Sequence, residues 1–167
     1  MKKKNIFERY YNSDRATKTI YGAILIFAFL IGQYHNTNNS ALPVVFGTFF
    51  SAVAIVLAEI YSEILGKTIK HKRKLSKNDR HELVNDSLAI ISISFWPSGI
   101  FMLSYLGLYD TNTAFIISYA LLISVLFISS YLANRLSNFS KYKSLLTAIL
   151  VSFLGVIVVV VKYSLGH

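Results

Sequence analysis

Apolar residues in this chain gather in five long runs separated by short polar or basic links. A helix of about 20 apolar residues is long enough to cross the hydrocarbon core of a bilayer. Backbone groups in hydrocarbon must be bonded within their own segment, so each run is predicted to be a helix. This holds even for 156–161, whose β-branched residues would suggest a strand in a soluble protein. The predicted spans are residues 19–34, 42–65, 85–108, 114–133 and 144–163.

This pattern predicts an all-α fold, a polytopic membrane bundle of five transmembrane helices. Residues 1–18 form a basic tail, and residues 19–167 form a single five-helix domain. The composition agrees, because 54% of the residues are hydrophobic, only 15% are charged and the mean hydropathy is +0.50. A soluble domain has a charged fraction of about 25%. The chain has no cysteine, which excludes disulfides, thiolate metal ligands and cysteine nucleophiles.

The basic residues are distributed very unevenly over the links. Six of the 17 lysines and arginines lie in residues 1–18, seven in 66–80 and three in 134–143, whereas the opposite side has only Lys162. Cytoplasmic loops accumulate lysine and arginine, so the N-terminus is predicted in the cytoplasm and the C-terminus outside. The net charge of +9 does not indicate nucleic-acid binding, because the charges lie in short runs between spans. The predicted location is the bacterial cytoplasmic (inner) membrane.

The second span carries two carboxylates, Glu59 and Glu63, near its basic end. An ionisable residue inside a span is costly and normally faces the bundle interior or a wet cavity. The spacing of four places both side chains on one helix face, where like charges repel and favour a bound proton or a shared cation. Glu59 and Glu63 are therefore candidate metal ligands. The simpler alternative for Glu63 is an ion pair with Lys67, four residues later.

Further acidic residues begin the third span. Ser76 and Asp79 have the spacing of a helix N-cap, and the helix they would start carries His81, Glu82 and Asp86. If this helix meets the second span, Glu59, Glu63, His81, Glu82 and Asp86 would line a cytoplasmic mouth, a pathway for an ion or a proton. Such groups suit divalent cations and can also relay protons. Alternatively, Glu82 and Asp86 only stabilise the positive end of their own helix.

Other residues are predicted to act locally, in a helix kink, in helix contacts or in binding lipid headgroups. Pro97 is expected to kink the third span and to free a backbone carbonyl, and Ser94 and Ser98 could satisfy the groups it releases. The serines of the fourth span, together with Gly22 and Gly155, are expected to permit close helix contact. The basic residues of the second link could hold anionic lipid headgroups. These residues are Lys67, Lys70, Lys72, Arg73 and Lys74.

The layout resembles small five-span bacterial membrane proteins and, more distantly, the vacuolar iron transporter family. The resemblance rests on the five spans, on Ala58-Glu59-Ile60-Tyr61 at the end of the second span, and on Pro97 in the third. It implies cation transport, with Glu59 as the residue that carries over. Two features depart from the family: residues 19–34 hold no acidic residue, and the family's acidic metal-binding segment is replaced here by the basic residues 66–80.

The sequence thus favours a transporter or channel-like protein for a small ion, a divalent metal or a proton, acting through Glu59. No enzyme motif is present, so no enzymatic activity and no cofactor are predicted, and a metal would be substrate. Five helices are few for a pathway, so a homo-oligomer is expected, most simply a dimer. The alternative is a non-transporting membrane subunit or scaffold whose basic cytoplasmic face binds anionic lipid or a partner protein.

Overall fold

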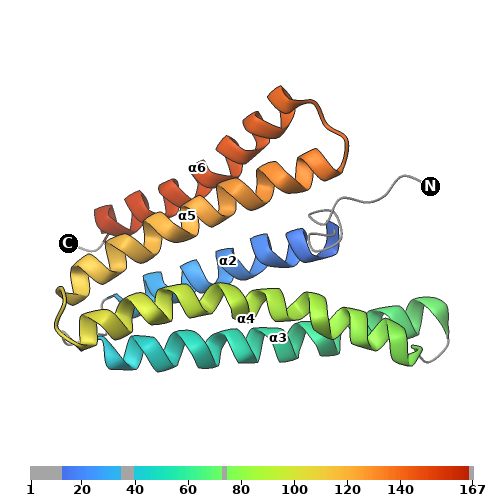
Figure 1. Ribbon diagram of the computed structural model, residues 1–167, viewed down its shortest axis with the longest axis horizontal. Coiled ribbons are helices and arrows are strands. Elements are labelled where there is room, and N and C mark those ends of the chain that lie inside the picture. Colours follow the sequence, from blue (N-terminus) through green and yellow to red (C-terminus); the bar gives the residue numbers. More distant parts are fainter. Residues whose placement is uncertain (1–12, 35–39, 73–74, 166–167) are drawn as a thin grey trace.

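The structure is a computed structural model of the 167-residue chain, and it describes residues 13–34, 40–72 and 75–165 (Figure 1). Over these ranges the chain is all-helical, without strands. The helices are α2 (Ser13–Gln33), α3 (Leu42–His71), α4 (Lys77–Tyr105), α5 (Thr111–Leu136) and α6 (Lys141–Leu165). The prediction of an all-α bundle is therefore confirmed, and so is helix over the β-branched run 156–161.

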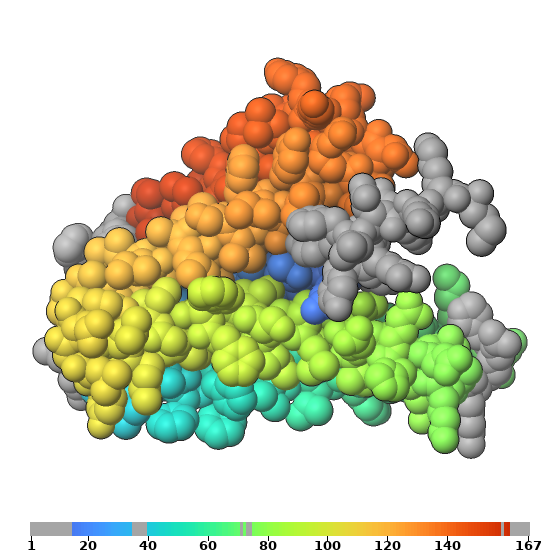
Figure 2. Space-filling model, viewed as in Figure 1, coloured from blue at the N-terminus to red at the C-terminus, as the bar shows by residue number. Residues whose placement is uncertain are grey.

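Helix α2 is the centre of the bundle. It lies between the pair α3–α4 and the pair α5–α6, and it packs most extensively on α4 and α5 (Figure 1). From the side drawn in Figure 2, α4 and α5 cover α2 almost completely. Successive helices run antiparallel, so the start of α2, the end of α3, the start of α4, the end of α5 and the start of α6 share one end of the molecule (Figure 1). We call this the basic end.

Four of the helices are long and apolar enough to cross a membrane, judged over the described residues. These candidate spans are Arg15–Gln33, Leu42–Lys70, Lys77–Tyr105 and Thr111–Leu136. They indicate a membrane protein. The fifth predicted span, 144–163, lies within α6, whose last side chains fall outside the described part of the chain.

The helices are longer than the predicted spans, and one difference matters for the site. The predicted boundary between the tail and the first span, at 18/19, falls inside α2, which begins at Ser13. The first 12 residues of the predicted tail lie outside the described residues. Lys18 is therefore a buried residue of a membrane helix and not part of a solvated tail.

Two helix starts are fixed by side-chain caps. Ser76 accepts a hydrogen bond from the Asp79 backbone N–H, and Asp79 accepts one from the Ser76 backbone N–H, which confirms the predicted start of α4. Asp110 caps α5 by accepting hydrogen bonds from the backbone N–H and the hydroxyl of Thr113. Because these hydrogen bonds stabilise the ionised carboxylate, they hold the pKa of Asp110 below its usual range.

Away from the basic end, the core is aromatic. The rings of Phe101 and Phe115 meet edge to face with centroids 4.7 Å apart, and Phe27 of α2 contacts Tyr119 of α5 at 5.3 Å. The Tyr119 hydroxyl donates to the Leu30 carbonyl at 3.4 Å. These contacts join α2, α4 and α5, and we call Phe27, Tyr34, Phe101, Phe115 and Tyr119 the aromatic cluster.

The predicted close helix contacts are confirmed in part. A Cβ at Gly22 would lie 2.9 Å from Ile90, so only glycine allows α2 to sit this near α4. At Gly155 a Cβ would lie 3.4 Å from Ile123, an ordinary contact distance, so glycine is not required there. In α5, three of the four predicted contact serines, Ser118, Ser129 and Ser130, are buried, whereas the fourth, Ser124, is exposed.

Candidate functional site

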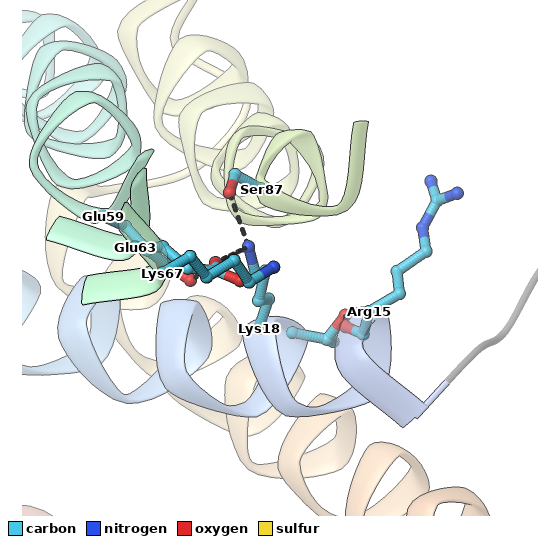
Figure 3. A network of polar contacts seen from close by, with 7 residues as sticks. Arg15, Lys18, Glu59, Glu63, Lys67 and Ser87 are labelled. Carbon is cyan, nitrogen blue, oxygen red and sulfur yellow. Dashed lines mark hydrogen bonds and ion pairs between the residues drawn. The ribbon is translucent and has the colours of Figure 1, made fainter. Parts of the chain in front are cut away.

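The site begins with Lys18, which points from α2 between α3 and α4 (Figure 3). Its ammonium lies 2.7 Å from Glu63 Oε2 and 3.5 Å from Glu59 Oε1, both on α3. It also donates to the Ser87 hydroxyl of α4 at 2.8 Å. Lys18 is only 7% exposed, and Ser87 is fully buried. We call Lys18, Glu59, Glu63 and Ser87 the lysine cluster.

The four groups meet because of their positions along α2, α3 and α4. The spacing of four puts Glu59 and Glu63 on the face of α3 that meets α2, as predicted. Ser87 lies one helical turn before Ile90, the residue that packs on Gly22 of α2. Since Gly22 is in turn four residues after Lys18, the close contact of α2 with α4 sets the depth at which Lys18 reaches Ser87.

The two carboxylates are not equally compensated. Glu63 contacts two ammonium groups, because Lys67 also lies 2.8 Å from its Oε1. Glu59 has only the 3.5 Å ion pair at one oxygen, which is longer than a good N–H···O hydrogen bond. Its other oxygen, Oε2, is buried and receives no hydrogen bond from any described residue. A buried carboxylate oxygen without a donor is costly, so Glu59 is the less well compensated of the two carboxylates.

An open groove of about 550 Å³ leads to the cluster. It lies between α2 and α3 and is lined by Thr17, Lys18, Tyr21, Ala58, Glu59, Ser62 and Glu63. The small side chains of Ala58 and Ser62 leave α3 open here. The two carboxylates and the ammonium can therefore be reached from one side of the bundle without separating the helices.

The other predicted members of the acidic mouth are placed differently. Asp86 is buried, beside Ser87 on α4, whereas Glu82 and His81 are exposed on the surface of α4. Among the described residues no three His, Asp or Glu side chains come together as a metal site would require. The expected mouth lined by all five residues does not form, because Glu82 and His81 lie on a face of α4 turned away from its neighbours.

The predicted ion pair of Glu63 with Lys67 is confirmed. Lys70 and Lys72 are exposed at the basic end, as lipid-binding residues would have to be. Arg73 and Lys74, which were predicted with them, lie outside the described residues.

Pro97 is buried within α4. Ser94 and Ser98, which were predicted to satisfy the backbone groups that Pro97 releases, do not do so. The Ser94 hydroxyl donates to the Ile91 carbonyl at 2.7 Å. The hydroxyl of Ser98 is buried and makes no hydrogen bond with any described residue. The Ile93 carbonyl cannot accept a hydrogen bond from Pro97, because proline has no N–H, and neither serine donates to it instead.

The prediction from sequence missed Lys18 and Ser87. Lys18 was assigned to the tail because it precedes the first apolar run. That run is only 16 residues long, however, which is short for a bilayer, and one more turn at its start brings Lys18 inside. Ser87 had no such indication, because serines are common in membrane helices.

No family model, curated protein or solved structure matches this chain. The resemblance to the vacuolar iron transporter family therefore stays a prediction.

Proposed function

We propose that this protein moves a small cation across a membrane, with Glu59 as the residue that binds it. The observation that supports this most is the lysine cluster itself, a buried ammonium shared by two carboxylates within membrane-spanning helices. Ionisable groups in such a position mark ion pathways and proton relays in membrane proteins. The groove between α2 and α3 provides access from one side.

The proposal includes the topology from which the access side follows. The protein has five spans, with α6 as the fifth, its N-terminus in the cytoplasm and its C-terminus outside, and it resides in the bacterial cytoplasmic membrane. The basic end, with Lys70 and Lys72, then faces the cytoplasm and anionic headgroups. The groove opens to the cytoplasmic side. A homodimer would complete a pathway for which one five-helix bundle is small.

Lys18 acts in this proposal as a tethered cation that competes with the transported one. When a cation binds Glu59, the long 3.5 Å pair with Lys18 is the contact that yields, because Lys18 keeps its shorter contacts to Glu63 and Ser87. A proton needs only this exchange. A divalent metal bridging Glu59 and Glu63 would have to displace the ammonium from both carboxylates, so the arrangement favours the proton of the two predicted ions.

The test is flux into liposomes that contain the purified protein. A trapped pH-sensitive dye reports protons, and a trapped metal-sensitive dye reports Mn²⁺. We expect proton flux from the natural protein and at least about a tenfold loss in Glu59→Gln, because the amide cannot take up a proton. Glu82→Gln is the matched control, since it removes an exposed carboxylate from the neighbouring helix.

The same experiment distinguishes transport from the alternative role. A scaffold whose basic face binds lipid or a partner protein would use the exposed Lys70 and Lys72 and would give no flux of either ion. Absence of flux, or flux that Glu59→Gln leaves unchanged, would therefore contradict the transport proposal.

A further inference from the structure

The buried face of α4 carries several polar residues. Five of its buried residues are polar, namely Asp86, Ser87, Ser94, Ser98 and Ser104. Its exposed face instead carries large apolar side chains, including Phe95, Trp96, Met102 and Leu103. Polar groups inside and apolar groups outside are expected where a helix borders a pathway and faces lipid on its other side.

Three of these serines form one line that starts at the lysine cluster. Ser87, Ser94 and Ser98 occupy positions i, i+7 and i+11, which share one face of a helix. Ser87 receives the hydrogen bond from Lys18. At 1.5 Å per residue, Ser98 lies roughly 16 Å further along α4, toward the end opposite to the basic end.

Near Ser98 one hydroxyl lacks a hydrogen-bond partner among the described residues, and one backbone carbonyl lacks its usual helical donor. The Ser98 hydroxyl is buried without a partner among the described residues, and the residue is only 8% exposed. Pro97 has no N–H for the carbonyl of Ile93, one turn earlier. Fully buried Thr48 of α3 lies within about a turn of this depth, because Phe49 and Phe95 are in ring contact with centroids 5.9 Å apart. The Thr48 hydroxyl donates to Val44, which leaves its oxygen free to accept.

We propose that this part of α4 is a second cation-binding site, with the Ser98 hydroxyl as a ligand, and that its cation is small and monovalent, a proton carried by water or Na⁺. We call it the α4 site. This inference rests on the proposed function and extends it, because it names the next binding point of the cation after Glu59.

The ligands of the α4 site favour a monovalent cation over a divalent one. Its oxygens belong to hydroxyls and a carbonyl, and residues 87–109 contain no Asp, Glu, Lys or Arg. Neutral oxygen dipoles replace the hydration of a monovalent cation, whereas divalent cations in proteins are normally held by carboxylates.

The experiment compares flux and stability in the same variants. Ser98→Ala and Ser92→Ala are reconstituted in liposomes with a trapped pH dye or with ²²Na⁺ outside. Ser92 is the matched control, because it is an exposed serine of the same helix whose hydroxyl bonds its own backbone at Leu88. We expect Ser98→Ala to lower the flux of the transported cation at least about tenfold, through loss of a hydrogen bond to a charged species, and Ser92→Ala to leave it unchanged.

Thermal unfolding in detergent separates this role from a structural one. The Ser98 hydroxyl has no partner to lose within the described part of the chain, so Ser98→Ala should unfold at the same temperature as the natural protein or higher. The single tryptophan, Trp96, is two residues from Ser98, and its fluorescence should respond to Na⁺ only if Na⁺ is the cation.

The outcomes distinguish this inference from the proposed function. Flux that Glu59→Gln abolishes but Ser98→Ala leaves unchanged would overturn the α4 site and keep the proposed function. Mn²⁺ flux that depends on Ser98 would overturn the assignment to a monovalent cation. No flux of any cation in the natural protein would overturn the proposed function, and the α4 site with it.

Discussion

The lysine cluster and the aromatic cluster both attach α2 to its neighbours, but they do so with opposite chemistry. The aromatic cluster joins α2 to α4 and α5 through ring contacts and buried apolar surface. The lysine cluster joins α2 to α3 and α4 through a buried ammonium. In a membrane, ring packing is stabilising, whereas burying charge carries a desolvation cost that ion pairs only partly offset.

The two clusters also differ in how completely their polar groups are compensated. In the aromatic cluster α2 is attached to α5 mainly by ring packing of Phe27 on Tyr119, because the Tyr119 hydroxyl makes only a long 3.4 Å contact with the Leu30 carbonyl. Among the described residues of the lysine cluster, Glu63 has two cationic partners, whereas Glu59 has one long contact and a buried oxygen without a donor. We therefore predict that the aromatic cluster contributes more to stability, whereas Glu59, whose charge is incompletely compensated, is the residue to which we assign the proposed function.

The largest effect on stability is expected in the aromatic cluster. Phe115 is fully buried and contacts the rings of Tyr34, Phe101 and Tyr119. Replacing it by alanine should lower the free energy of unfolding by about 3–5 kcal/mol, as for other buried phenylalanines. Denaturant unfolding in mixed micelles measures this, with Phe153→Ala, an exposed ring on α6, as the control. Equal losses in both variants would contradict the assignment.

A smaller loss is expected when the cation of the lysine cluster is removed. Lys18→Met keeps the length of the side chain but leaves Glu63 with Lys67 alone and Glu59 with no cation among the described residues. Breaking a buried pair costs about 3 kcal/mol or more, but Glu63 is partly exposed, so we expect about 2–3 kcal/mol. The same unfolding assay measures it, and Lys70→Met is the exposed control. Unchanged stability in Lys18→Met would show that the cluster does not hold α2 in place.

The smallest effect is expected outside both clusters, at the cap of α5. The hydrogen bonds from Thr113 hold the pKa of Asp110 below its value in the unfolded chain. The ionised cap therefore contributes stability above the unfolded pKa, and this contribution is lost as the pH falls through the folded pKa. Unfolding temperatures measured over the acidic range should show this decline, and it should be weaker in Asp110→Asn. An identical decline in that variant would assign the pH dependence to other groups.

The fold was largely predictable from the sequence. The apolar runs predicted the helices, and the Ser76 to Asp79 spacing predicted where α4 begins. The boundaries were less predictable, because a membrane helix continues past its apolar run wherever a neighbouring helix covers it. Lys18 shows this most clearly, since only the packing of α2 on α3 and α4 makes its position a buried one.

The site was predictable in part. Glu59 and Glu63 could be found because carboxylates inside an apolar run are costly, and their common face followed from their spacing. Lys18, the cation that pairs with them, could not be predicted. It comes from another helix, and its partners depend on how α2 packs against α3 and α4. Likewise, the spacing of Glu82 and Asp86 gave a shared helix face but not the rotation of α4, which buries Asp86 and leaves Glu82 exposed.

The most direct test of the division between the two clusters is to measure proton flux and the free energy of unfolding together on Glu59→Gln. We predict a flux reduced at least about tenfold, because the amide cannot exchange a proton, and a nearly unchanged stability, because Lys18 keeps its contacts with Glu63 and Ser87. A variant that loses stability but retains flux would contradict it, because Glu59 would then be a structural partner of Lys18.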